Sequence, residues 1–251
     1  AMTEMFRGAT NFKGYVGSWN PPTSASTTNM FLYAFDFKTT FSCDDANDGP
    51  PNSCRIPLTD ATISSAITAC LAESSMTGEC TEYAISSGYG MMPDWDVSAV
   101  TDMEEAFKDY TSFNADLSSW DVSSVENMKK MFNGATSFNA VITGWDVSKV
   151  KNMNKMFNQA YAFNQDISKW DVSSVENMEY LFRDATAFDQ DISDWSVSTS
   201  AQTTEMFDGA TAFTTPRQIT VAIATTQNVF NDAEIDLEIS VTASICASSE
   251  C

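Results

Sequence analysis

Carboxylate side chains are the first groups in this sequence whose type and spacing could do chemistry. Asp116, Asp166 and Asp191 recur in a register of 25 residues that Val141 interrupts. Carboxylate oxygens are the ligands that Ca²⁺ prefers, so this column is a calcium candidate. The ligand-dense Asp-x-Asp-x-Asp-Gly loop is absent, however. Because Asp also bonds nearby backbone groups and suits tight turns, the alternative is that these residues form the corners of a repeat.

Cysteine is the second reactive residue type, and its six copies form three close pairs: Cys43/Cys54, Cys70/Cys80 and Cys246/Cys251. The sequence does not fix their connectivity, although pairing of neighbours is the simplest arrangement. The chain has no histidine and no Cys-x-x-Cys motif, which disfavours a zinc site. Disulfides form in oxidising compartments, so we expect an extracellular or cell-surface protein. The sequence begins with Ala1 rather than Met, and we expect that a secretion signal has been removed.

The charge balance narrows the classes of partner. With 34 acidic and 13 basic residues, the formal net charge is −21. Nucleic acid and anionic membranes require clustered Lys and Arg, so neither is an expected partner. No apolar run is long enough to span a membrane. With no histidine and no Gly-rich phosphate loop, we expect no enzyme and no cofactor apart from the calcium alternative. We also expect no ice-binding face, which would need threonines repeated in register.

The element that must position all these residues is a repeat. A tryptophan recurs every 25 residues, and the letters after it recur too: WDVSSVENMKKMFNGATSFN at 120–139 and WDVSKVKNMNKMFNQAYAFN at 145–164. A fixed period of this length is the mark of a solenoid, in which each coil buries its apolar side by stacking on its neighbours. The tryptophans are Trp95, Trp120, Trp145, Trp170 and Trp195.

Each coil is predicted to contain one short parallel strand and one short helical turn, which is an α/β repeat. In the second coil the strand is expected within Asp121–Asn127, and the helical turn within Lys129–Gly134, closed by a left-handed glycine. Phenylalanines at two positions of every coil should form two buried columns, with methionines in a third. The phenylalanine columns are Phe107, Phe132, Phe157, Phe182 and Phe207, and Phe113, Phe138, Phe163, Phe188 and Phe213.

The repeat divides the chain into five parts. The solenoid occupies residues 94–213, and caps are expected at both of its ends. Residues 60–93 form the N-terminal cap, with an amphipathic helix over Asp60–Leu71 and Asp60 as its N-cap. Residues 21–59 are an extended, disulfide-looped segment. Residues 214–251 hold a degenerate coil and a β-rich cap in which Ile235, Leu237, Ile239 and Val241 alternate with polar residues.

Residues 1–20 repeat the lettering of a coil far ahead of the main array. Met2–Phe12 matches Met128–Phe138 position for position, but the strand half is missing. Half a coil cannot bury its own apolar side chains. It therefore folds back on its own cap, or docks on the C-terminal end of a neighbouring subunit, unless Ala1 is an arbitrary cut. The expected interface comprises Met2, Met5, Phe6, Phe12, Trp19, Ile235, Leu237, Ile239 and Val241.

At WDVSSVENMKKMFNGATSFN the sequence resembles the BspA-like leucine-rich-repeat surface proteins, which share a 25-residue Trp-Asp-x-Ser-x-Val-x-x-Met-x-x-Met-Phe unit. The resemblance covers residues 94–213, and it implies a leucine-rich-repeat-like solenoid with adhesive or structural roles. It supplies no catalytic residues.

Two functions fit these features. The first is a secreted structural subunit that assembles head to tail into an extracellular filament, because head-to-tail contacts that do not close a ring give open fibres. Its partner would be itself, with other surface or matrix components alongside. The alternative is a monomeric cell-surface adhesion or binding module.

Overall fold

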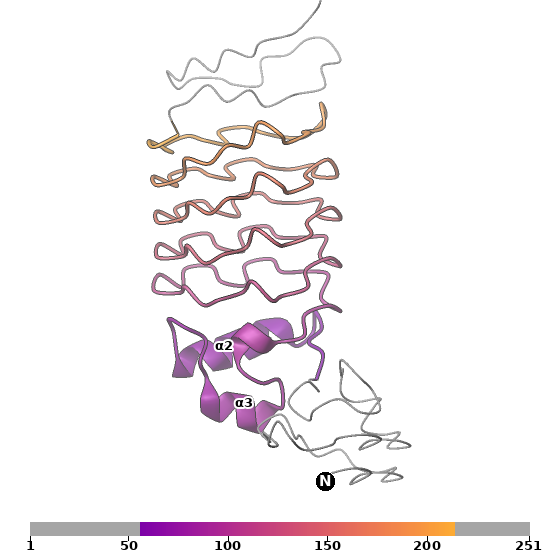
Figure 1. The fold of residues 1–251 in the computed structure, drawn as a ribbon, viewed down its shortest axis with the longest axis vertical. Coiled ribbons are helices and arrows are strands. Elements are labelled where there is room, and N and C mark those ends of the chain that lie inside the picture. The colour runs from indigo at the N-terminus through magenta and orange to yellow at the C-terminus, as the bar shows by residue number, and fades with distance from the viewer. Residues whose placement is uncertain (1–55, 214–251) are drawn as a thin grey trace, which may run out of the picture.

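The computed structural model describes residues 56–213, which contain two α-helices, a short 3-10 helix and a stack of coils (Figure 1). Helix α2 spans Ile63–Glu73, α3 spans Thr81–Ser87, and the 3-10 helix η2 spans Met92–Asp94. The chain then winds through coils that lie one above another, with α2 across the end of the stack and α3 beyond it. Within the described part, no helix has the length and apolarity needed to cross a membrane.

Each coil begins at a repeat tryptophan, and we number the coils first to fifth from Trp95 to Trp195. Single residues of adjacent coils pair in parallel: Asp102 with Asn127, Asn127 with Asn152, Asn152 with Asn177, and Asn177 with Gln202. Every pair joins residues one repeat apart. Residues at equivalent positions of successive repeats therefore lie side by side in the stack.

The backbone between coils follows an alternating pattern in what we call the rung segment, residues 127–134 of the second coil and the equivalents 102–109, 152–159, 177–184 and 202–209. The amides of Met128, Lys130 and Phe132 donate to carbonyls of the third coil at 2.8 to 2.9 Å. The amides between them bond within the same coil: that of Met131 donates to the Met128 carbonyl, and that of Lys129 donates to the Asn127 side chain, both at 3.1 Å. Every second amide therefore ties one coil to the next.

This alternation replaces the regular elements expected in each coil. A helix would direct every amide four residues back, whereas here half of them serve the neighbouring coil. Lys130, with φ 56°, and Gly134, with φ 72°, are both left-handed, so the chain turns twice where one left-handed closure was expected. In place of a short strand over 121–127, a turn closes between Val125 and Val122, and only Asn127 is bridged.

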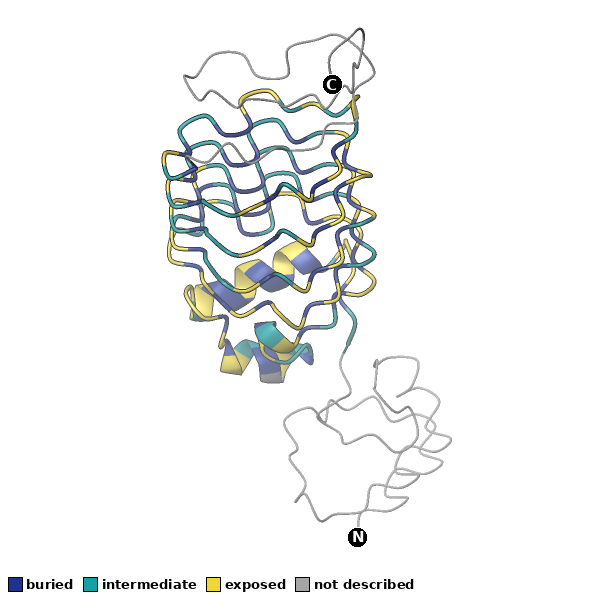
Figure 2. Cartoon of the chain, turned by 45° about the horizontal axis from the view of Figure 1, so that its top comes forward, coloured by how far each residue is buried: buried dark blue, intermediate teal, exposed yellow. Residues whose placement is uncertain are grey.

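Buried positions recur in every coil (Figure 2), and the largest fully buried side chains are phenylalanines and Trp195. Phe157 is fully buried, and its ring lies 5.7 Å from those of both Phe132 and Phe182, nearly parallel to each. It also stacks on Phe163 of its own coil at 3.9 Å. The indole N–H of each tryptophan from the third coil on donates to a carbonyl 28 residues earlier, as Trp145 does to Leu117 at 3.0 Å. The buried indole thus keeps a hydrogen-bond partner.

The two helices close the N-terminal end of this core. The buried residues of α2 fall at helical spacing and belong to the same apolar cluster as the first coil: Ile63, Ala66, Ile67, Cys70 and Leu71. Helix α3 begins under the carboxylate of Glu73, which accepts the amides of Glu82 and Tyr83 at 3.0 Å each. Those amide bonds hold the pKa of Glu73 below its usual value.

Candidate functional site

A network of polar contacts lies at the end of the stack beside α2, and Asp60 is at its centre. From the second coil to the first, and from the fourth to the third, one backbone carbonyl accepts two consecutive amides. The carbonyl of Lys151, for example, accepts the amides of Glu176 and Asn177 at 2.8 and 3.3 Å. The first coil has no preceding coil within 56–213. There the Asp60 carboxylate accepts the amides of Thr101 and Asp102 at 2.7 and 3.0 Å.

Asp60 therefore imitates the carbonyl of a preceding coil. Its second oxygen accepts the Thr101 hydroxyl at 2.7 Å. Partial burial would raise the pKa of Asp60, but the bonds from the Thr101 hydroxyl and the two amides outweigh it, so the pKa lies below its usual value. The prediction that Asp60 is the N-cap of the helix is wrong: Thr62 holds that place, and α2 starts at Ile63.

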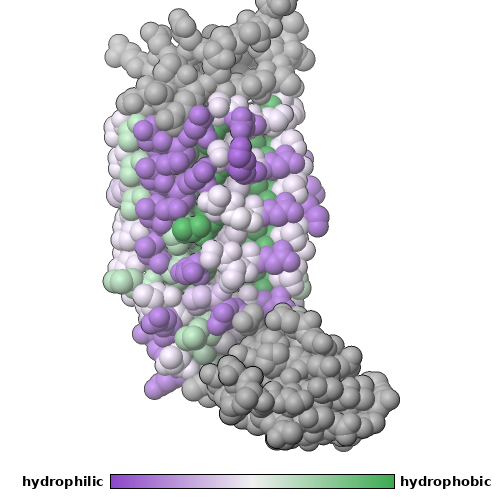
Figure 3. Space-filling model, in the orientation of Figure 1, coloured by the Kyte–Doolittle hydropathy of each residue, from purple (hydrophilic) through white to green (hydrophobic). Residues whose placement is uncertain are grey.

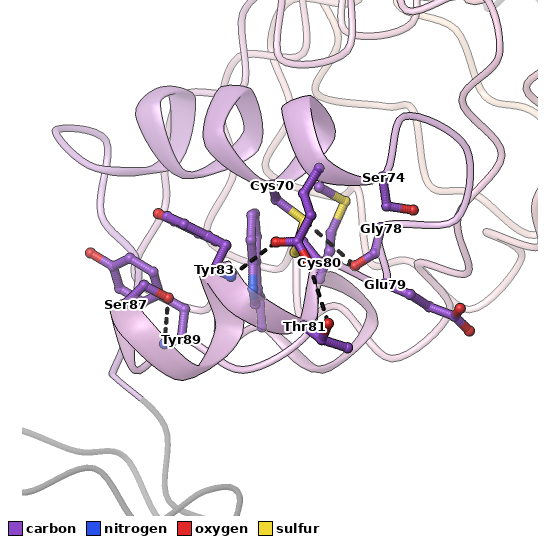
Figure 4. The surroundings of a disulfide bond; sticks show 12 residues. Cys70, Ser74, Gly78, Glu79, Cys80, Thr81, Tyr83, Ser87 and Tyr89 are labelled. Atoms are coloured by element: carbon purple, nitrogen blue, oxygen red, sulfur yellow. Dashed lines mark hydrogen bonds between the residues drawn. A yellow bond between two sulfur atoms is a disulfide. The ribbon is translucent and has the colours of Figure 1, made fainter.

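A disulfide fastens the cap together. Cys70 of α2 and Cys80, directly before α3, are joined, and both are fully buried. Figure 4 shows the bond between the two helices, with Tyr83 and Tyr89 nearby. This is the pairing of neighbours that the sequence favoured for these two cysteines. Cys43, Cys54, Cys246 and Cys251 lie outside the described residues.

The calcium candidates lie at corners of the coils. Asp116 accepts the amide of Ser118 at 2.9 Å, and Asp166 and Asp191 accept the amides two residues on at 3.0 Å. Hydrogen bonds from the side chain and amide of Ser118 lower the pKa of Asp116. No group of three or more His, Cys, Asp or Glu that could hold a metal occurs in residues 56–213. These carboxylates act as turn residues, and calcium binding remains a prediction.

Charged side chains form rows along the stack. Lys129 pairs with Glu104 at 2.6 Å, and Lys130 with Glu105 at 2.7 Å, each across one repeat. Figure 3 shows hydrophilic side chains gathered in such rows from coil to coil. The hydrogen bond from Lys129 is the main reason that the pKa of Glu104 falls below its usual value. Exposed ion pairs of this kind add little to the free energy of unfolding. Their main effect is to favour the register in which these coils are neighbours.

The predicted assembly residues cannot be placed. Met2, Met5, Phe6, Phe12 and Trp19 lie outside the described residues, as do the C-terminal members Ile235, Leu237, Ile239 and Val241.

Sequence reasoning missed two features. The first is the role of Asp60, for which the only signal was a carboxylate just ahead of a helix. The second is a threonine row in register, since Thr111, Thr136, Thr186 and Thr211 occupy equivalent positions, with Tyr161 between them. The Thr136 hydroxyl donates to the Thr111 carbonyl at 3.1 Å, so this row bonds one coil to the next.

Comparison with known proteins places the chain in a family. A family model described as "Mycoplasma protein of unknown function, DUF285" matches residues 1–48, 89–159 and 140–238, which together are more than half of the chain. The protein therefore belongs to the DUF285 family. No curated protein and no solved structure matches it.

Proposed function

We propose that this protein is a secreted structural subunit that assembles head to tail into an extracellular filament or surface fibre. We further propose that its coil stack is a leucine-rich-repeat-like solenoid of the BspA-like surface proteins. In this proposal the leading repeat, residues 1–20, stacks on the C-terminal end of a neighbouring subunit and extends its array.

The observation that carries the proposal is the position of the leading repeat relative to the cap. In the sequence, Phe6 and Phe12 match Phe132 and Phe138, which lie in the aromatic columns and are fully buried. The aromatic core of the first coil is joined to the apolar residues of α2, which lies across that end of the stack. A leading repeat therefore needs another aromatic end on which to stack, and the C-terminal end of a second copy would supply one.

Two further findings support the proposal. The family model matches residues 1–48 separately from the main array, and the cap helices lie mostly in the unmatched interval. The disulfide between Cys70 and Cys80 suits an extracellular protein. The continuous stack, with every coil bonded to the next, suits a structural element.

Negative-stain electron microscopy tests the proposal on the full chain, a chain without residues 1–20, and the variant Phe6→Asp with Phe12→Asp. We expect filaments from the full chain and monomers from the other two. Met76→Asp is the matched control, because Met76 is 58% exposed in the cap, and it should form filaments normally. Monodisperse full-length monomers would overturn the proposal and favour the alternative, a monomeric adhesion module.

A further inference from the structure

The first coil has a row of backbone carbonyls along the edge that faces the cap. In the later coils the equivalent carbonyls accept amides of the coil before. In the second coil the carbonyls of Asn127, Lys129 and Met131 accept amides of the first coil at 2.8 to 2.9 Å. The equivalent carbonyls of the first coil belong to Asp102, Glu104 and Ala106. No amide or side chain among the residues of the described stack and cap donates to these three. Within residues 56–213 this edge is therefore an unpaired parallel ladder, of the kind to which an added strand can bind.

A hollow of about 210 Å³ lies along the same edge, between it and the start of α2. Ile63, Met103 and Ala106 provide its apolar lining. Ala106 stands where the following coils carry a large side chain, namely Met131, Met156, Leu181 and Met206. The hollow therefore includes the space that a large side chain fills in the later coils, and it lies beside the unpaired backbone edge.

The rim of the hollow is acidic. Asp60, Asp102 and Glu104 line it. Among the described residues, the one ion pair that these three carboxylates form joins Glu104 to Lys129 of the second coil. The second coil shows which side chains suit the adjoining carboxylates, because Lys129 and Lys130 both reach across to them. An occupant on the opposite side meets the carboxylates of Asp60 and Asp102, which form no ion pair within residues 56–213, and their negative charge favours Lys or Arg.

We propose that this edge is a docking site for a short, extended, basic segment of a partner protein. The segment takes the place of the rung segment of a preceding coil and donates its amides to the carbonyls of Glu104 and Ala106. One apolar side chain fills the hollow over Ala106, and flanking Lys or Arg side chains face Asp60 and Asp102. This contact is distinct from the proposed filament joint, which uses the other end of the stack.

Two peptides taken from the chain itself test the proposal by fluorescence anisotropy with the intact protein. The probe is the end-blocked peptide of residues 126–131, Glu-Asn-Met-Lys-Lys-Met, and its matched control is residues 101–106, Thr-Asp-Met-Glu-Glu-Ala. Both carry the rung lettering, but only the first is basic. We expect the probe to bind at least ten-fold more tightly than the control, and binding to weaken as salt is raised.

Two variants locate the site. Ala106→Met fills the hollow with the residue that later coils carry there, so it should leave the melting temperature unchanged or higher and lower probe affinity at least ten-fold. Glu104→Gln should lower it several-fold. Equal binding of the two peptides, or undiminished binding to both variants, would overturn the proposal. Tighter binding of a peptide of residues 2–7 than of the basic probe would also overturn it, in favour of the chain's own leading repeat.

Discussion

Glycine at position 134 should be required by the stack, and its replacement gives the sharpest test of the coil geometry. Gly134 has φ 72°, and a Cβ added there would collide with the carboxylate of Asp109 in the preceding coil. Gly144 is the matched control, because a Cβ there meets nothing within 4 Å.

The magnitude follows from two contributions. A left-handed L-residue costs about 1–2 kcal/mol. Displacing the Asp109 side chain from its rotamer adds about 0.5–1.5 kcal/mol. The stack tolerates the first cost elsewhere, since Gln159 holds the equivalent position with φ 59°. We therefore expect Gly134→Ala to destabilise the protein by about 1.5–3.5 kcal/mol, whereas Gly144→Ala should be neutral or stabilise it by up to about 1 kcal/mol.

Thermal unfolding followed by tryptophan fluorescence measures the difference. For a chain of this size about 2–4 °C corresponds to 1 kcal/mol, so Gly134→Ala should lower Tm by roughly 3–14 °C. Asp109→Ala in the Gly134→Ala background removes the collision and should restore part of the loss, while the left-handed cost remains. If the two glycine variants melt alike, or the second substitution restores nothing, the stacking of Asp109 on Gly134 is wrong.

Three further outcomes follow from the structure. Asp60→Ala should lower the free energy of unfolding by only about 1 kcal/mol, because water replaces part of the lost hydrogen bonds. Hydrogen exchange at the Thr101 amide should become faster, and unchanged exchange would refute the capping role. Because its pKa is lowered in the folded state, the contribution of Asp60 should be present above the ordinary value of 3.8 and be lost as pH falls below it, which the same exchange measurement at acid pH detects. Phe157→Ala should cost about 3–5 kcal/mol, measured by urea unfolding, since it empties a fully buried site between two rings; a loss under 1 kcal/mol would contradict the column. Joint replacement of Cys70 and Cys80 by Ser should cost about 2–4 kcal/mol and open the cap first, and equal exchange rates in cap and coils would argue against that order.

The repeated sequence correctly predicted which side chains of neighbouring coils stack on one another. Fixed spacing of Phe132 and Phe157 implied rings stacked one above another, and they lie 5.7 Å apart. The lettering could not show how the backbone within a coil is used, because Lys129–Gly134 is composed of residues that also suit a helix. There the demand for bonds between coils overrides local helix propensity.

The candidate site was harder to foresee for a different reason. Asp60 lies 41 residues from Thr101 in sequence, and no periodicity links a cap residue to the coil it completes. The acidic corners Asp116 and Asp166 were foreseen in their alternative role, since Asp two residues before Ser is a local turn signal. Tertiary pairing of unique residues has no such local signal, whereas repeated pairing does.

The single-residue bridges between coils affect how the number of coils in such a protein can change in evolution. Because every interface joins equivalent positions one repeat apart, a duplication or deletion of 25 residues would present each remaining coil with a neighbour of the same kind. The cap contacts the first coil and, through the bond from the Trp120 indole to the Met92 carbonyl, the start of the second, so it would be unaffected by the number of coils that follow these two. Length is then a heritable variable that a lineage can adjust in steps of one coil, without redesigning either the core or the closing helices.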